Sequence, residues 1–242
     1  PADMKTPRAR VVLFLGCAGA AQQGGALQAA SKLLRRAGYQ VSVPADAGCC
    51  GAMSQHSGDL SAAAQLADIN RSAFGPDLDA VVSIASGCGI HIDSYQPAMP
   101  SRHLDIVKFL LDRGGFTGDD FAPLPRQVLL HTPCSIENVY RGAGWARALL
   151  ALIPQLEILS LGEAGQCCGA AGDYMLRRPG TAARLRQPLL DRIPPGTAHI
   201  VLTGNVGCAM HLADGLRDRD PAVEVLHPVE LLARQLRDRP SA

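Results

Sequence analysis

The eight cysteines of this chain form two sets with the same order and nearly the same spacing. Each set has a single cysteine, then a vicinal pair followed by glycine, then another single cysteine. Between the first cysteine and the pair lie 31 residues in one set and 32 in the other, and 37 and 39 residues separate the pair from the last cysteine. No cysteine is left over, so we expect the thiols to serve a shared chemistry. The sets are Cys17, Cys49, Cys50 and Cys88, and Cys134, Cys167, Cys168 and Cys208.

The apolar segments that precede the cysteines also match between the two halves of the chain. Residues 11–16 precede Cys17 as residues 128–133 precede Cys134. A period of about 120 residues is too long for one unit of a solenoid, so it predicts two fused copies of one fold. We expect the repeats at residues 8–115 and 125–242, joined by a segment with glycine and proline residues that interrupt periodic structure.

Short β-branched or leucine-rich segments alternate with helical patterns in each half, which is typical of parallel strands joined by helical crossovers. The expected fold is α/β, with two tandem pseudo-symmetric repeats, each a small parallel sheet flanked by helices. Each cysteine group would follow the carboxyl end of a strand, where open parallel sheets bind ligands. We predict strands at 11–15, 40–43, 80–84, 128–130, 156–159 and 199–202, and helices at 25–37, 59–73, 144–152 and 181–192.

Four thiols gathered at the edge of each sheet fit a soft metal, and their number fits a four-iron cluster. Adjacent residues of an extended strand point to opposite faces, so both thiols of a vicinal pair reach one centre only where the backbone turns sharply. Gly51 and Gly169 follow the two pairs, and glycine both accepts a positive φ and lets the chain approach a cofactor closely. We therefore predict that all eight cysteines are metal ligands, and that Gly51 and Gly169 lie against the cofactor.

Zinc and a purely structural role are the alternatives for these cysteines. Structural zinc sites commonly contain two close C-x₂₋₄-C pairs, a pattern that one vicinal pair with two single cysteines does not match. We see no apolar run of membrane-spanning length and no export signal before the first strand, and we expect a cytoplasmic protein without direct membrane insertion. In that reducing compartment a disulfide framework is disfavoured.

A histidine follows the last cysteine of each set by three residues, His91 after Cys88 and His211 after Cys208. On a helix this spacing places the imidazole on the face of the cysteine. We therefore count His91 and His211 among the cofactor-binding residues, where an imidazole can ligate iron, donate to a sulfide or carry a proton. The alternative is a histidine bonded to the backbone at a helix start.

Residues 103–107 and 227–231 resemble each other as well, and each segment opens a helical apolar pattern. We expect His103 and His227 to cap these repeated helices.

The composition, the net charge and the absence of nucleotide-binding motifs limit the classes of function that the sequence supports. With 47% hydrophobic and 19% charged residues the chain is globular. Its net charge is +1 and its arginines are interspersed with acids, which gives no basis for a nucleic-acid partner. No G-x-G-x-x-G or Walker pattern follows a predicted strand, so the sequence does not support a nucleotide or flavin site in this chain.

Two copies of the Cys…Cys-Cys-Gly…Cys pattern resemble the cysteine-rich CCG domain family over nearly the whole chain. Within that family the chain looks most like the carboxyl-terminal part of the glycolate oxidase iron–sulfur subunit. It is also similar to lactate utilisation protein A and to the B subunit of heterodisulfide reductase. The segments that carry the resemblance are residues 47–52, 85–89, 167–172 and 205–212.

The resemblance implies an iron–sulfur electron-transfer subunit with one [4Fe-4S] cluster per repeat, in a complex that oxidises glycolate or lactate. It implies two partners, a flavin-containing dehydrogenase subunit and a ferredoxin-like iron–sulfur subunit or domain, through which the chain would lie peripherally at the inner face of the membrane. The glycolate oxidase subunit has an amino-terminal ferredoxin-like region that is missing from these 242 residues. We therefore expect a carboxyl-terminal portion or a separately encoded subunit.

The resemblance to heterodisulfide reductase has one departure. The B subunit of that enzyme ends each motif in Cys-x-x-Cys, whereas Ala85 and Asn205 stand three residues before the last cysteines here. The missing fifth thiol favours a conventional four-iron cluster that relays electrons. The alternatives are a catalytic subunit of the heterodisulfide reductase type, acting on a disulfide or thiol, and a zinc-stabilised interaction module. An open cavity beside a site favours catalysis, and a flat protein-facing edge favours relay.

Overall fold

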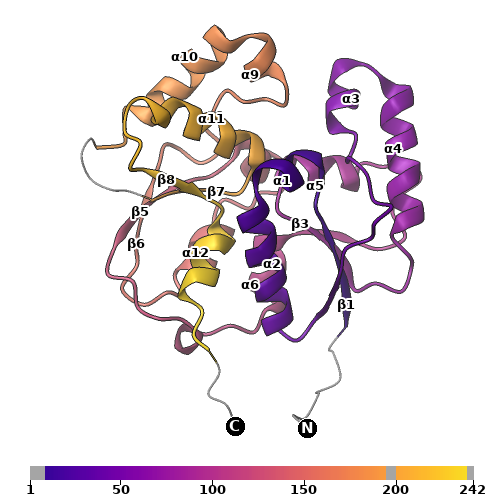
Figure 1. The fold of residues 1–242 in the computed structure, drawn as a ribbon, viewed down its shortest axis with the longest axis horizontal. Coiled ribbons are helices and arrows are strands. Elements are labelled where there is room, and N and C mark those ends of the chain that lie inside the picture. The colour runs from indigo at the N-terminus through magenta and orange to yellow at the C-terminus, as the bar shows by residue number, and fades with distance from the viewer. Residues whose placement is uncertain (1–8, 195–199, 239–242) are drawn as a thin grey trace.

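The computed structural model describes residues 9–194 and 200–238, and it contains two parallel sheets of four strands each (Figure 1). The strand order is β2-β1-β3-β4 in the first sheet and β6-β5-β7-β8 in the second, so both sheets have one topology. The predicted α/β fold with two tandem repeats is therefore confirmed. The strands are β1 (Arg10–Phe14), β2 (Gln40–Ser42), β3 (Ala80–Ser83), β4 (His103–Asp105), β5 (Gln127–His131), β6 (Glu157–Ser160), β7 (Ile200–Thr203) and β8 (Glu224–Leu226).

Helices connect the strands and flank both sheets (Figure 1). Over the described ranges, no helix combines the length and the apolar character needed to span a bilayer. In the first repeat the helices are α1 (Cys17–Gln22), α2 (Gly24–Arg36), α3 (Ala52–Ser57), α4 (Leu60–Ala73), α5 (Ser86–Asp93) and α6 (Ile106–Arg113). After the short 3₁₀ helix η1 (Gly118–Asp120) come α7 (Cys134–Asn138), α8 (Trp145–Leu150), α9 (Tyr174–Arg177), α10 (Pro179–Leu190), α11 (Val206–Arg217) and α12 (Pro228–Gln235).

The structure has a fourth strand in each repeat that the sequence did not predict. Strands β4 and β8 are each only three residues long and carry polar residues, so their hydrophobic pattern is weak. The six predicted strands match β1–β3 and β5–β7 within about two residues at each end, the usual uncertainty of element boundaries. Residue 199, the predicted start of the sixth strand, lies outside the described residues.

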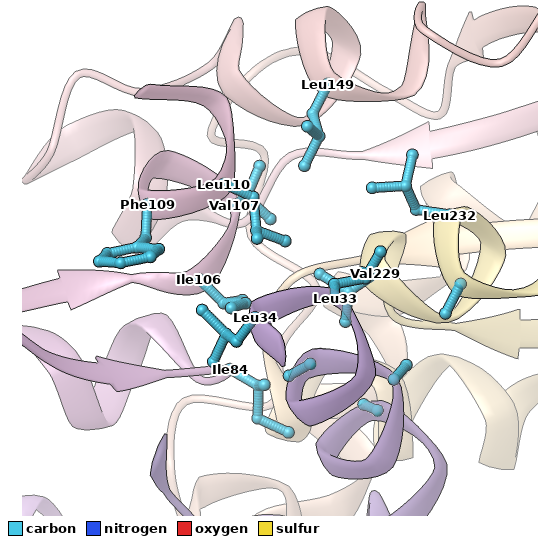
Figure 2. Packing of buried hydrophobic residues seen from close by; sticks show 14 of the residues in the cluster. Leu33, Leu34, Ile84, Ile106, Val107, Phe109, Leu110, Leu149, Val229 and Leu232 are labelled. Carbon is cyan, nitrogen blue, oxygen red and sulfur yellow. The ribbon is translucent and has the colours of Figure 1, made fainter. Parts of the chain in front are cut away.

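The two repeats share one hydrophobic core, which lies between the sheets (Figure 2). Helix α12 packs on α2, and the matching helix α6 packs on α8, so each repeat presents the same surface to the other. Such reciprocal packing is the mark of a pseudo-two-fold interface. The side chains labelled in Figure 2 come from both repeats and include Leu33, Phe109, Leu149 and Leu232.

Helices α6 and α12 begin with different capping residues. His227 Nδ1 accepts a hydrogen bond from Val229 N at 3.2 Å, so it caps α12 as expected. In the first repeat Asp105 Oδ1 takes this place and accepts from Val107 N at 2.8 Å. The prediction that His103 caps a helix is therefore wrong: it lies two residues earlier on β4, and its Nε2 is 2.9 Å from Ser83 Oγ. A carboxylate and an imidazole nitrogen both accept from a backbone N–H, so either can cap a helix.

Because the core is shared, a cavity made in one repeat should destabilise both. Leu33 is fully buried in α2. We expect Leu33→Ala to lower the free energy of unfolding by about 2–5 kcal/mol, within a single cooperative transition. The measurement is anaerobic denaturant unfolding followed by circular dichroism and fluorescence. The control is Leu176→Ala, since Leu176 is 74% exposed and should change stability by about 0.5 kcal/mol or less. Two separate transitions, only one of them shifted, would contradict a shared core.

Candidate metal centres

All cysteines lie just beyond the carboxyl ends of strands, on loops or in the first turn of a helix. Cys17 and Cys134 are the first residues of α1 and α7, and Cys88 and Cys208 lie in the first turns of α5 and α11. The vicinal pairs lie on the loops that follow β2 and β6.

The structure brings the four cysteines of each set together as free thiols. In the first repeat Cys17 Sγ lies 3.3 Å from Cys49 Sγ, and Cys50 forms hydrogen bonds with both Cys49 and Cys88. In the second repeat Cys168 Sγ lies 2.8 Å from Cys208 Sγ, and Cys134 interacts with Cys167 and Cys168. We name these groups the first quartet (Cys17, Cys49, Cys50, Cys88) and the second quartet (Cys134, Cys167, Cys168, Cys208).

The sulfur atoms meet in close pairs. Over residues 9–194 and 200–238, no three histidine, cysteine or acidic side chains are placed to hold a single metal ion.

Crowding of the thiols shifts their pKa values. The pKa of Cys49 is raised, chiefly by its hydrogen bond with Cys50 and then by burial. At Cys50 the hydrogen bond from Cys49 lowers the pKa, but the hydrogen bond with Cys88, burial and the charge of Cys88 outweigh it and raise the pKa to about 12. In the second quartet the hydrogen bond with Cys168 is the main cause that raises the pKa of Cys208.

The raised pKa values reflect the cost of placing negatively charged thiolates next to one another in a partly buried site. A cation among the thiolates would offset that cost. A bound metal supplies that positive charge and deprotonates coordinating thiols outright. Both quartets also consist of sulfur donors, which soft metals and iron–sulfur clusters select. The four sulfur donors of each quartet therefore match the chemistry of an iron–sulfur cluster, which is larger than the single metal ion that these side chains are not placed to hold.

Gly51 and Gly169 allow each vicinal pair to turn toward its quartet. Their φ angles are 88° and 84°, in the left-handed region that glycine adopts without strain. Their N–H groups donate to the sulfur of the first cysteine of the pair, at 3.5 Å to Cys49 Sγ and 3.3 Å to Cys167 Sγ. Amide donors of this kind stabilise a thiolate and tune the potential of a bound cluster.

Both glycines also lie close to the backbone of a neighbouring helix. A Cβ at Gly169 would overlap the carbonyl oxygen of Ala182 on α10, and one at Gly51 would stand 3.2 Å from the carbonyl oxygen of Ala63 on α4. Close packing on a helix is therefore a second reason for glycine at these positions.

Different side chains hold the loop of the vicinal pair in the two repeats. In the first repeat the fully buried Asn70 accepts from Gly48 N at 3.0 Å and donates to Cys49 O at 2.9 Å, and Tyr95 OH donates to Cys50 O at 2.6 Å. Neither Asn70 nor Tyr95 was predicted from the sequence. A polar residue on the apolar face of a helical segment was the signal for Asn70, because such a residue needs a buried partner.

In the second repeat the fully buried His131 holds the equivalent loop. Its Nδ1 lies 2.9 Å from Thr203 Oγ1 and its Nε2 lies 3.2 Å from Gln166 O, next to Cys167. Burial lowers the pKa of His131, so this imidazole is neutral near pH 7.

His91 and His211 lie where the helical spacing placed them, three residues after the last cysteine on α5 and α11. Their Nε2 atoms are inaccessible to solvent and have no hydrogen-bond partner among the described residues. Burial lowers the pKa of both imidazoles; at His91 the charge of His56 adds to this effect, and at His211 the facing carbonyl of Ala182 opposes it.

A cavity of about 230 Å³ opens beside the first quartet. It reaches Cys17 and Cys49 and is otherwise lined by apolar side chains and backbone, including Leu15, Ala20 and Val43. In the second repeat the counterpart of Ala20 is Glu137, whose Cβ and Cγ would stand 3.2 Å from a Cβ at Gly165. The two quartets therefore differ in what surrounds their first cysteine.

Ala85 and Asn205, three residues before the last cysteine of each set, have structural roles. Ala85 is 6% exposed. Asn205 Oδ1 accepts from Gly207 N at 2.9 Å and caps α11, while its Nδ2 donates to Ser86 Oγ of the other repeat at 2.9 Å. Ser86 Oγ also lies 2.6 Å from Ser135 Oγ, so polar contacts join the repeats between the two quartets.

Two matched parallel sheets, each with four thiols at its carboxyl edge, define a duplicated cysteine-rich α/β protein. The chain belongs to the CCG cysteine-rich domain family, whose model matches residues 11–93 and 128–213. The two matched segments contain all eight cysteines.

Curated relatives match over most of this chain. The B subunit of the fumarate reductase (CoM/CoB) of Methanothermobacter marburgensis is 29% identical over 94% of this chain and 47% of its own length. The glycolate oxidase iron–sulfur subunit of Escherichia coli K12 is 26% identical over 94% of this chain and 58% of its own length. Lactate utilization protein A of Oceanobacillus iheyensis is 24% identical, over 92% of this chain and 96% of its own length. The chain thus spans about half the length of the first two relatives.

The close approach of Gly169 to α10 predicts a substitution effect. Gly169→Ala should destabilise the protein by about 1 kcal/mol through its positive φ and by about 1–3 kcal/mol more through overlap with Ala182. The control is Gly58→Ala, because Gly58 has a φ of 89° but no atom within 4 Å of its Cβ position. Equal losses in the free energy of unfolding for the two variants would contradict this packing.

The side chain of Asn70 should protect the cysteines of the first quartet, but not those of the second, from alkylation. Asn70→Leu leaves Gly48 N, Cys49 O and Tyr95 OH without this partner and should cost at least about 2 kcal/mol of stability. We expect faster alkylation of Cys49 and Cys50, measured by mass spectrometry on the metal-free protein, and no change at Cys167 and Cys168. The control is Gln65→Leu on the exposed face of α4. Equal acceleration in both repeats would show that Asn70 stabilises the whole fold instead.

Proposed function

We propose that each quartet binds one [4Fe-4S] cluster and that the chain is an iron–sulfur electron-transfer subunit. The observation that carries this proposal is the convergence of four thiols in each of two matched repeats. A cluster with several irons accepts the two thiolates of a vicinal pair on different irons. The relatives named as iron–sulfur subunits support an iron–sulfur cofactor in this family.

The proposed ligands are the eight cysteines of the two quartets, with Gly51, Gly169, His91 and His211 as further residues around the cofactors. The proposed repeat boundaries remain 8–115 and 125–242, which extend beyond the family matches at 11–93 and 128–213. A cluster bound at these sites would supply one-electron transfer. The chain's own contribution is to hold the thiolates and to donate amide hydrogen bonds from Gly51 and Gly169.

The proposed complex oxidises glycolate or lactate through a flavin. A flavin-containing dehydrogenase subunit would bind the substrate, and a ferredoxin-like iron–sulfur subunit or domain would be the second partner. The names of the glycolate oxidase and lactate utilization relatives support this assignment. We propose a cytoplasmic chain that reaches the membrane only through these partners.

The cavity beside the first quartet favours a second candidate, a catalytic subunit similar to the B subunit of heterodisulfide reductase. A cavity of about 230 Å³ that reaches two of the proposed ligands leaves room for a small molecule beside the first cluster. The relative named as a CoM/CoB fumarate reductase component also favours it. Against it stands the missing fifth thiol, since Ala85 is buried and Asn205 caps a helix.

Single substitutions test whether there are two independent centres. Because each quartet is complete within one repeat, Cys49→Ser and Cys167→Ser should each remove about half of the bound iron and acid-labile sulfide. The measurement is iron and sulfide per chain after anaerobic purification, with Ser57→Ala on the surface of α3 as the control. The two-centre proposal fails if one cysteine variant loses all iron and the other none. A colourless, folded, zinc-containing protein would favour the zinc-stabilised interaction module instead.

A further inference from the structure

A cavity of about 490 Å³ lies between α1 of the first repeat and α9, α10 and α11 of the second. Helix α10 contacts both α9 and α11, and α11 contacts α1 (Figure 1). No cysteine lines this cavity, so it is distinct from the cavity beside Cys17. We name it the α10 cavity, and its apolar lining comes from Met175, Leu176, Pro179, Ala183 and Met210.

The helices around the α10 cavity expose apolar side chains to solvent. Leu176 is 74% exposed, Leu185 is 45% exposed and Tyr174 is 36% exposed. Several exposed apolar groups next to a cavity mark a surface that another molecule covers. Met175 and Met210 line the cavity with flexible, polarisable side chains, which adapt to the shape of an inserted group. The cavity therefore suits an apolar side chain of a partner.

The same helices carry positive charge. Residues 174–190 contain four arginines and no acidic residue, whereas the matching residues 52–73 of the first repeat contain one arginine and two aspartates. Two of the four arginines, Arg178 and Arg184, are exposed and form no ion pair with a carboxylate of the described residues. A partner that complements this surface carries carboxylates, and the matching helices of the first repeat offer it no equivalent.

The α10 cavity adjoins the second quartet. Met210 lies two residues after Cys208 on α11. Met175 packs against the apolar cluster that contains Cys168 and Cys208, and its N–H donates to Ala170 O at 3.1 Å. Met175 therefore contacts both the cavity and the cluster of side chains that holds part of the second quartet. A molecule docked in the cavity would lie beside the second quartet.

A protein fits these features better than a nucleic acid or a lipid surface. An apolar recess with charged groups around it is typical of the point where a protein partner inserts an anchoring side chain. Asp214 lines the cavity together with Arg186, and its carboxylate would repel a phosphate group placed there. A bilayer takes up protruding apolar groups and does not fill a recess.

We propose that the α10 cavity is the docking site of an acidic electron-transfer protein. The partner inserts an apolar side chain beside Leu176 and places carboxylates near Arg178 and Arg184. This inference rests on the proposed function, because the second centre is taken as the point where electrons enter or leave the chain. Opposite charges speed the encounter at low ionic strength, and the apolar anchor slows dissociation.

The test measures the binding of a small acidic [2Fe-2S] ferredoxin to the anaerobically purified holoprotein by isothermal titration calorimetry. We expect binding that weakens as the ionic strength rises. Leu176→Asp should weaken it at least about tenfold, because it places a carboxylate in an apolar contact with an acidic partner. Arg178→Glu combined with Arg184→Glu should weaken it by a similar factor and remove most of the salt dependence.

Matched controls change the same residue types elsewhere. Leu60→Asp alters a leucine that is 59% exposed on α4, which precedes β3 as α10 precedes β7. Arg126→Glu alters an exposed arginine just before β5, at the sheet edge opposite the cysteines. Both controls should bind the ferredoxin as the unaltered chain does. Circular dichroism and iron content are measured first, and if Leu176→Asp does not fold, Leu176→Ala replaces it and should weaken binding at least about threefold.

No binding of the ferredoxin to the unaltered holoprotein, or equal binding by Leu176→Asp and Leu60→Asp, would overturn the inference. Equally tight binding of a basic cytochrome c would overturn it as well. So would binding to vesicles of phosphatidylcholine and phosphatidylglycerol that depends on Leu176, in place of binding to the ferredoxin. Absence of iron from the unaltered chain would overturn the proposed function and the electron-transfer role of the partner, whereas the titration decides the docking site separately.

Discussion

Both candidate centres depend on the meeting of parallel strand ends at one edge of a sheet. In each repeat the first three strands in chain order lie side by side, so the loops that follow them converge although they are far apart in sequence. The thiols then repel one another as thiolates, which is why burial and mutual contact raise most of their resolved pKa values. A cationic core in each quartet would offset this repulsion, which is the physical ground for the proposed metal centres.

The two centres share a framework but differ in their surroundings. One hydrophobic core unites α2, α6, α8 and α12, so the repeats form a single pseudo-symmetric unit with the quartets held in a defined relation. The repeats differ around the quartets. Asn70 or His131 holds the loop of the vicinal pair, and the histidine after the last cysteine lies beside Ser94 in the first repeat and Arg186 in the second. Duplication thus preserved the thiols, and substitution gave each centre its own electrostatic environment.

The periodic features of this protein could be predicted from its sequence, and the features that depend on one side chain could not. Cysteine spacing and hydrophobic pattern recur along the whole chain. They predict the duplication, the parallel α/β repeats and the grouping of the cysteines. Strands β4 and β8 were missed because three polar-containing residues carry little pattern. The cap at Asp105 and the contacts of Asn70 depend on tertiary partners that spacing alone cannot show, because several residue types accept the same hydrogen bond. Ala20 lines the cavity beside Cys17, whereas Glu137 at the equivalent position of the other repeat lies against Gly165.

The most direct test is the metal content and spectrum of the unaltered chain, purified without oxygen. Two four-iron centres predict about eight irons and eight acid-labile sulfides per chain, with a paramagnetic resonance signal that appears or disappears on one-electron reduction. Stoichiometric zinc, or a folded chain with no bound metal and no sulfide after anaerobic reconstitution, would contradict the assignment of both quartets.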